Sequence, residues 1–167
     1  MMKPLASSPQ VVAVEPLYIT SKTIDIPFLL SQYEDDEAGA VVLFNGTVRR
    51  QSLGKEVSHL FYEAAETMAH KMIRDFMQEA QNKWQLKIVF AVHRIGKVLV
   101  GESAIAVITA SPHRKEAYEA NRYLVEKIKH ELPLWKCEYF ADSTKKWGGN
   151  CSCQEITGNP NQHIYDI

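Results

Sequence analysis

Two lysines and a His-Arg pair carry side chains that could act on an anionic substrate. Lys129 and Lys136 are close in the chain, and His113 directly precedes Arg114. Guanidinium groups and the first N–H groups of a helix bind phosphates and carboxylates. Amines stabilise an oxyanion, and burial beside a second cation lowers the pKa of a lysine enough for proton transfer. Each residue taken singly also fits an ordinary solvated surface position, so the combination carries the hypothesis of an anion site.

One predicted helix, followed directly by a short strand, positions these four residues. Ser111 is a favourable N-cap, Pro112 fits the first helical position, and Pro133 must end the helix. Apolar residues recur between them at steps of three and four, which indicates a single buried stripe. The residues of this stripe are Ala117, Ala120, Leu124, Ile128 and Leu132.

The same pattern distributes the charged side chains along the helix. His113 and Arg114 are expected in the first turn, where the helix dipole favours an anion. Lys129 is expected in the last turn, and Lys136 in a short strand after the stop.

The rest of the chain predicts an α+β fold with a largely antiparallel sheet and two main amphipathic helices. Residues 39–48 are rich in β-branched and aromatic types and are expected to form a buried strand. Residues 57–64 are expected to return beside it as a hairpin around the basic loop 49–55, which could bind an anion or be a simple solvated turn. Further strands are expected at 16–20, 86–95 and 102–110, and helices at 26–33 and 67–84.

Length and composition indicate one ordinary globular domain. The chain has 167 residues, 46% hydrophobic and 23% charged, with a formal net charge of −1. This balance excludes a global basic field for nucleic acid, and no apolar run is long enough to cross a bilayer. Residues 1–15 are expected to be a loose arm without a signal peptide, 16–153 a single α+β domain, and 154–167 a weakly ordered tail of a cytoplasmic protein.

The three cysteines suggest no disulfide framework and no metal site. They are Cys137, Cys151 and Cys153, and an odd count with two nearly adjacent members favours reduced thiols. A single Cys-x-Cys lacks the second ligand pair that structural zinc needs. No cofactor is expected. His93, flanked by apolar residues, is expected to be a structural histidine.

With these elements placed, the sequence resembles the large, catalytic subunit of molybdopterin synthase, the MoaE family. The resemblance covers roughly residues 16–153 in the order of the family. The motifs that carry it are Phe44-Asn45-Gly46-Thr47-Val48-Arg49, Tyr62-Glu63-Ala64, His93-Arg94-Ile95-Gly96, His113-Arg114-Lys115-Glu116-Ala117 with Glu119-Ala120, Lys129 with Pro133-Leu134-Trp135-Lys136-Cys137-Glu138, and Trp147-Gly148-Gly149-Asn150.

The resemblance implies a fold like the alpha/beta hammerhead and a sulfurtransferase activity. Such enzymes convert cyclic pyranopterin monophosphate into molybdopterin by adding two sulfurs as a dithiolene, a step of molybdenum cofactor biosynthesis. The sulfur arrives as a thiocarboxylate on the Gly-Gly C-terminus of a small ubiquitin-like (MoaD-like) subunit. Two large subunits form a homodimer with one small subunit at each outer end, a heterotetramer.

The resemblance also implies the site residues. Lys129 and Lys136 would be catalytic, Lys136 nearest the inserted C-terminus and Lys129 orienting substrate or moving protons. For Cys137, a backbone contact or plain packing is favoured over a role of the thiol. The positions that match substrate contacts of the family are Thr47, Val48, Arg49, His113, Arg114, Lys129, Lys136, Cys137 and Glu138.

Two rival functions stay open at this point. The first is a non-catalytic dimeric module that binds the ubiquitin-like tail or a pterin phosphate, against which the presence of both lysines argues. The second is a cysteine-based sulfurtransferase, which would need Cys137 as a thiolate of low pKa. Sequence does not decide whether His113 and Arg114 serve their own chain or a neighbouring one.

Overall fold

The computed structural model describes residues 17–149, which form two β-sheets and three helices. The elements in chain order are β1 (Ile19–Thr20), α1 (Ile26–Gln32), β2 (Ala40–Thr47), β3 (Gln51–Ser52), β4 (Lys55–Ala64), α2 (Glu66–Trp84), β5 (Ile88–Arg94), β6 (Gly96–Leu99), β7 (Ser103–Ser111), α3 (Arg114–Glu131), β8 (Leu134–Phe140) and β9 (Lys145–Gly149). The predicted α+β class with mainly antiparallel pairing is confirmed.

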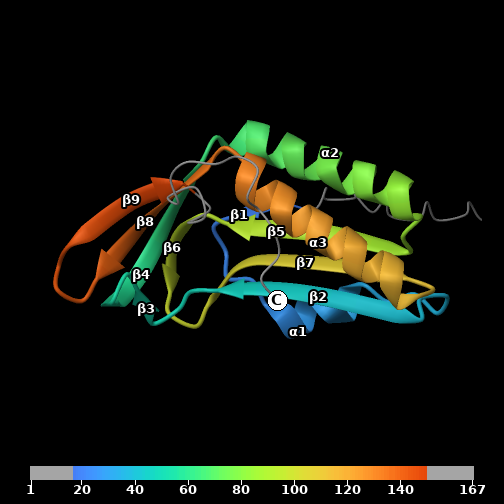
Figure 1. The fold of residues 1–167 in the computed structure, drawn as a ribbon, viewed down its shortest axis with the longest axis horizontal. Helices are drawn as coiled ribbons and strands as arrows, with labels where there is room; N and C mark the ends of the chain where they lie inside the picture. The colour runs from blue at the N-terminus through green and yellow to red at the C-terminus, as the bar shows by residue number, and fades with distance from the viewer. Residues whose placement is uncertain (1–16, 150–167) are drawn as a thin grey trace, which may run out of the picture.

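The first sheet is the base on which the two long helices lie. Its order is β1-β5-β7-β2, and only the β1–β5 pair is parallel. α2 and α3 cover one face of this sheet and the short α1 lies on the other (Figure 1). β7 is the most buried strand, with every residue from Ser103 to Ser111 buried. It lies between β5 and β2, and helices cover both faces of its sheet (Figure 1).

The second sheet lies at one end of the first and is built around β4. β8 pairs along one side of β4, while β3 and β6 pair along the other. β9 adds outside β8, so the C-terminal end of α3 leads directly into the middle of this sheet (Figure 1). One face of the sheet closes the main core through Leu60, Val98, Leu134 and Phe140.

The predicted hairpin between residues 39–48 and 57–64 is wrong. β2 pairs with β7 in the first sheet, whereas β4 belongs to the second, so the basic loop connects the two sheets. The local hairpin is β3–β4, whose turn residues Leu53 and Gly54 both have positive φ angles. β2 is also an edge strand and only partly buried, with Val41 52% exposed, because it has a neighbour on one side alone.

The predicted stripe and stop of the third helix are confirmed, but its predicted start is wrong. Ala117, Ala120, Leu124 and Ile128 are fully buried, and the helix ends at Glu131 because Pro133 holds the preceding residue in an extended conformation. At the other end, β7 continues through Ser111, which pairs with Ala40, and His113 is the N-cap. Sheet pairing therefore prevails over the local capping preference of serine.

The buried face of α2 is confirmed as core packing, with Ile73 and Ala80 completely inaccessible. Within residues 17–149, no helix is long and apolar enough to cross a membrane. The predicted N-terminal arm, the C-terminal tail, Cys151 and Cys153 lie outside the described residues.

Candidate active site

Two lysines that are separated by Pro133 in the chain converge where α3 meets the second sheet. Lys129 occupies the last turn of α3, and Lys136 lies on β8, which starts directly after the proline. Burial holds the pKa of Lys129 below its usual value, and the nearby charge of Lys136 lowers it further, against the opposing effect of Glu126. Lys129 is thereby suited to give up and regain a proton closer to neutral pH.

Lys136 is partnered by a carboxylate on its own strand. Its Nζ lies 3.3 Å from Oε1 of Glu138, and the two side chains are only 15% and 11% exposed. They share a face because alternate residues of a strand point to the same side. The hydroxyl of Ser52 donates to the other carboxylate oxygen at 3.0 Å, which ties β3 and the loop before it to β8.

Tyr62 lies directly opposite Lys136 on β4, so its phenol belongs to the same site. Burial, with a smaller effect of the Glu138 carboxylate, raises the pKa of Tyr62 to about 12. The phenol therefore stays protonated at neutral pH and can donate a hydrogen bond.

His93, at the end of β5, is buried beneath the site, next to Tyr62. Its ring packs edge-on against the Tyr62 ring, with centroids 5.0 Å apart, and Nδ1 lies 2.8 Å from the carbonyl oxygen of Arg94. A carbonyl only accepts, so Nδ1 carries the hydrogen and Nε2 is unprotonated in the neutral ring. Burial, with a smaller effect of the Lys129 charge, lowers the pKa of His93 to about 4, although the hydrogen bond to Arg94 opposes this shift. The prediction of a structural histidine agrees with this hydrogen-bonded, buried ring.

The aromatic side chain of Phe44, on β2, lies near Lys129. The Nζ of Lys129 lies 6.0 Å from the centre of the Phe44 ring. A Cβ at Gly46 would come within 2.5 Å of the Ile105 side chain and 3.2 Å of the Phe44 ring. A residue larger than glycine at this position would therefore push the Ile105 side chain away and crowd the Phe44 ring.

The predicted contacts at the end of β2 divide into exposed and anchored residues. Thr47 and Arg49 are exposed, and within residues 17–149 the Arg49 side chain makes no hydrogen bond or ion pair. Val48 is 3% exposed, and its backbone is held by the Glu102 carbonyl and the Gly101 N–H. These two backbone hydrogen bonds hold Val48 in place and thereby fix the backbone position of the neighbouring Arg49.

His113 and Arg114 lie at the opposite end of α3 from the lysines. Both are exposed. At about 1.5 Å per residue, Arg114 is about 22 Å from Lys129 along the helix axis. The structure therefore does not bring this pair together with Lys129 and Lys136 within one chain.

Cys137 is completely buried and its side chain points away from the lysines. It alternates with Lys136 on β8, so its thiol lies on the other face of the sheet, opposite Phe61 and Trp147 of the neighbouring strands. Only its backbone could contact a molecule bound beside Lys136.

The site therefore combines two amines, a neutral imidazole and a protonated phenol around one carboxylate. This set can stabilise a negatively charged intermediate and move a proton. Within the described residues, no group of three or more His, Cys, Asp or Glu side chains could hold a metal ion. Sequence reasoning did not assign Tyr62, Phe44 or Ser52 to the site, although the first two lie in the motifs that carry the resemblance.

Comparisons with known proteins agree with the sequence resemblance. The family model described as MoaE protein matches residues 19–131. The chain is 40% identical over 148 residues to the molybdopterin synthase catalytic subunit of Bacillus subtilis strain 168, covering 89% of this chain and 92% of that protein. It is 38% identical to the protein of the same name from Dictyostelium discoideum, covering 87% and 94%.

A solved structure has the same fold at similar identity. The crystal structure of molybdopterin synthase from Staphylococcus aureus superimposes with a TM-score of 0.74 at 37% sequence identity. The match covers 80% of this chain and 96% of the other. The fold of most of this chain therefore has a counterpart in a solved structure.

Proposed function

The chain belongs to the MoaE family, and we propose on this premise that it is the catalytic subunit of a molybdopterin synthase. Its substrate would be cyclic pyranopterin monophosphate, and its sulfur donor the thiocarboxylate of a small ubiquitin-like subunit. The observation that carries the proposal is the convergence of Lys129 and Lys136, from two different elements, in one partly buried site. The relatives named as catalytic subunits support a separate partner subunit.

The chemistry assigns a role to each amine. The thiocarboxylate sulfur displaces an oxygen substituent from a substrate carbon: the C–S bond forms as the C–O bond breaks, and the oxygen leaves with the electron pair and takes up a proton. The product is a thioester between substrate and partner. Water then adds to the thioester carbonyl, and the tetrahedral oxyanion collapses to leave a thiol on the substrate and a carboxylate on the partner. Lys136, held by Glu138, would stabilise the oxyanion. Lys129, whose pKa is lowered, would take and return protons.

The phosphate of the substrate needs donors that these two lysines do not supply. Arg49 is exposed and makes no bond within residues 17–149, so its guanidinium is available for a bidentate contact. His113 and Arg114 are too distant in the same chain, since about 22 Å of α3 lies between Arg114 and Lys129. They would instead serve the site of a second copy in a homodimer.

Strand β2 offers an edge through which such a dimer could form. Its start lies beside the start of α3, because a Cβ at Gly39 would lie 2.3 Å from the Pro112 carbonyl oxygen. Its other end lies beside the lysines through Phe44. Antiparallel pairing of β2 with its copy across a two-fold axis would bring His113 and Arg114 of each chain toward the lysines of the other.

The position of Cys137 weighs against the cysteine-based alternative. A catalytic thiol must reach the substrate as a thiolate, whereas this one is fully buried on the face away from Lys136. The other alternative, a non-catalytic binding module, would bind the same molecules as the enzyme. Only a measurement of turnover distinguishes the two functions.

A single-turnover assay tests the proposal. The wild type, with thiocarboxylated small subunit and cyclic pyranopterin monophosphate, should form molybdopterin. Lys136→Ala and Lys129→Ala should form almost none while still folding and binding the partner. Lys127→Ala is the matched control, because Lys127 lies on the same helix but pairs with Glu131 at its surface. Partner binding without product in the wild type would favour the binding module instead, and near-normal turnover in either alanine variant would remove the role given to that lysine.

Mixed dimers test the shared site. A dimer of one Lys136→Ala chain and one Arg114→Ala chain contains one intact site if the arginine acts across the interface, and none if it acts within its own chain. Recovery of about half the wild-type activity in the purified mixed dimer, or about a quarter in an equal, randomly exchanged mixture, supports the shared site. Absence of recovery from verified mixed dimers contradicts it.

A further inference from the structure

The hydroxyl of Tyr62 is a buried polar group that the chain itself does not use. The side chain is 8% exposed, and within residues 17–149 its hydroxyl makes no hydrogen bond. Folded proteins pair the large majority of buried polar groups with the chain, with water or with a ligand. An unused donor beside the two lysines therefore points to a molecule that binds in the site.

The polar groups around Tyr62 are held by other partners. Oε1 of Glu138 lies 3.3 Å from Nζ of Lys136, and Oε2 of Glu138 accepts a hydrogen bond from Ser52 at 3.0 Å. His93 contacts Tyr62 through ring packing, with centroids 5.0 Å apart. The phenol is thus fixed by its ring, and its O–H remains available to donate.

Strand pairing fixes Tyr62 from both sides. On β4 it lies opposite Lys136 of β8 and opposite Gly96 of β6. Directly opposite residues on neighbouring strands point to the same face, with Cβ atoms about 5 Å apart. The phenol and the amine can therefore reach the same small group on this face. A donor that is held in this way needs no reorientation when negative charge develops beside it.

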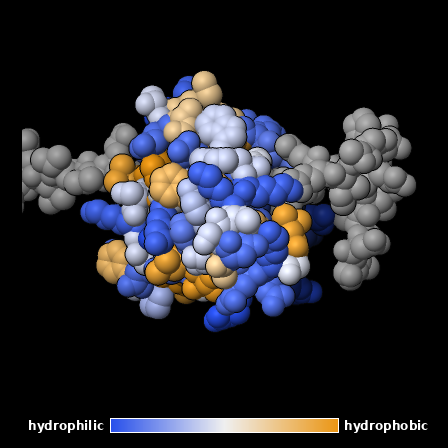
Figure 2. All heavy atoms as spheres, turned by 90° about the vertical axis from the view of Figure 1, so that its left-hand side faces the viewer, coloured by the Kyte–Doolittle hydropathy of each residue, from blue (hydrophilic) through white to orange (hydrophobic). Residues whose placement is uncertain are grey.

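The hydroxyl is withdrawn from the water-exposed surface of the second sheet. Figure 2 looks at the end of the molecule where this sheet lies and shows a mainly hydrophilic surface with scattered hydrophobic side chains. Tyr62 belongs to the sheet but packs in the main core. A hydrogen bond made in such a partly desolvated site is electrostatically stronger than one at the surface. Burial, with a smaller effect of Glu138, raises the pKa of Tyr62 to about 12, so the donor keeps its proton at neutral pH.

We propose that Tyr62 is a further catalytic residue, whose hydroxyl donates a hydrogen bond to the carbonyl oxygen of the thioester between substrate and partner. Together with Lys136 it would form the oxyanion hole for the hydrolysis of that thioester. This inference rests on the proposed function, which places the thioester carbonyl beside Lys136.

The step assigns every electron pair and proton. As the oxygen of water bonds to the carbonyl carbon, the π pair of the carbonyl moves onto its oxygen, and a proton of water passes to Lys129. The oxyanion then returns this pair, the C–S bond breaks, and the sulfur leaves with its electrons on the substrate. The partner retains a carboxylate. Tyr62 keeps its own proton throughout and contributes only the hydrogen bond.

The Tyr62→Phe variant tests the hydroxyl alone, because it keeps the ring that packs against His93. At saturating substrate and thiocarboxylated partner, its single-turnover rate should fall by about 100-fold, as expected for loss of one oxyanion donor. The half-saturating concentrations should not change. The thioester should accumulate, which intact mass spectrometry detects as the small subunit carrying the mass of the substrate. Tyr123→Phe is the matched control, since the Tyr123 hydroxyl donates to Glu79 between the two long helices, and it should turn over normally.

Stability separates this catalytic role from a structural one. Because the hydroxyl has no partner among residues 17–149, Tyr62→Phe should keep the wild-type urea midpoint, whereas Tyr62→Leu, which loses the ring, should lower it. A normal rate in Tyr62→Phe beside an active wild type would overturn the inference. A slower rate with a lower urea midpoint, or without accumulation of the thioester, would overturn it as well. Absence of product from the wild type would overturn the proposed function instead.

Discussion

Lys136 and Glu138 form an ion pair two residues apart on one strand, with Nζ 3.3 Å from Oε1 and little exposure of either side chain. The carboxylate also accepts a hydrogen bond from Ser52, so it links the lysine to the loop that carries Arg49. This pair places a positive charge in a partly buried site without leaving that charge uncompensated.

Replacing the carboxylate should cost stability. Glu138→Gln retains an acceptor for Ser52 but removes the counter-charge from Lys136, so the free energy of unfolding should fall by about 2 kcal/mol. Urea denaturation measures this change. Glu131→Gln, which breaks the surface pair with Lys127, should cost less than about 0.5 kcal/mol. Equal losses in both variants would show that Glu138 is effectively solvated.

Arginine substitutions should separate the roles of the two amines. Arginine keeps the positive charge but cannot release a proton at accessible pH. Lys129→Arg should therefore lower single-turnover rates by about 100-fold or more, as expected for loss of a general acid–base group. Lys136→Arg should retain measurable turnover, because its role requires charge alone. Greater loss in Lys136→Arg, with partner binding intact in both, would exchange the two assignments.

His93 should make the fold sensitive to mild acid. Its pKa is lowered to about 4 in the folded chain, whereas the unfolded value is about 6.5, so the unfolded state binds the proton more readily. The stability contributed by the neutral ring is complete above about pH 6.5 and is lost between there and pH 4, to a total of about 3 kcal/mol.

This acid sensitivity can be assigned by substitution. The free energy of unfolding, measured from pH 7 to pH 4, should fall less steeply in His93→Asn than in the wild type. His113→Asn is the control, because His113 is exposed, and it should follow the wild-type curve. Parallel curves for all three proteins would mean that water reaches the His93 ring.

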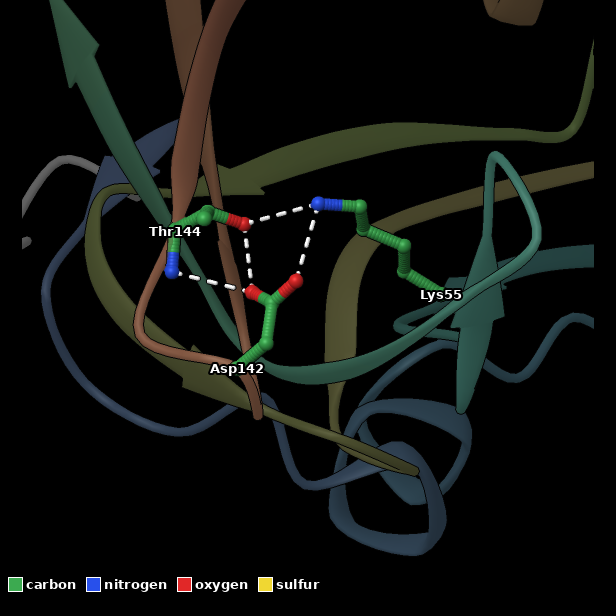
Figure 3. A network of polar contacts seen from close by, with 3 residues as sticks. All are labelled: Lys55, Asp142 and Thr144. Carbon is green, nitrogen blue, oxygen red and sulfur yellow. Dashed lines mark hydrogen bonds and ion pairs between the residues drawn. The ribbon is translucent and has the colours of Figure 1, made fainter.

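The turn before β9 should loosen when its ion pair is removed. Hydrogen bonds from Lys55 and Thr144 hold the pKa of Asp142 well below its usual range (Figure 3). The stabilisation is therefore present above about pH 3.9 and is lost as the pH falls below that value toward the folded pKa. In Lys55→Met, amide hydrogen exchange of Ala141 should be faster than in the wild type at pH 6, and the difference should narrow in acid.

A second lysine variant controls for the loss of surface charge. Lys71→Met breaks an exposed pair with Asp75 on α2, far along the chain from the turn, and should leave the exchange of Ala141 unchanged. Unchanged exchange in Lys55→Met would show that backbone bonds alone, such as that from Ala141 to the Glu56 carbonyl, hold the turn.

Local patterns in the sequence determined the long helices, with Lys129 in the last turn of α3, and the short strand that carries Lys136. The apolar stripe of α3 and the stop at Pro133 follow from periodicity and ring geometry, which act over one or two turns. The same local reasoning misplaced the start of α3 and joined residues 39–48 to 57–64. Ser111 is held in β7 by pairing with Ala40, and β2 pairs with β7, partners that are distant in the chain.

Only the tertiary structure decided which residues share a site. It placed Tyr62 opposite Lys136, packed His93 against Tyr62, and turned Cys137 to the other face of the sheet. The separation of Arg114 from Lys129 by the length of α3, by contrast, already followed from the predicted helix. The shared site required the tertiary structure because strand register depends on contacts between segments far apart in the chain, and a shift of one residue would reverse the face on which each strand side chain lies.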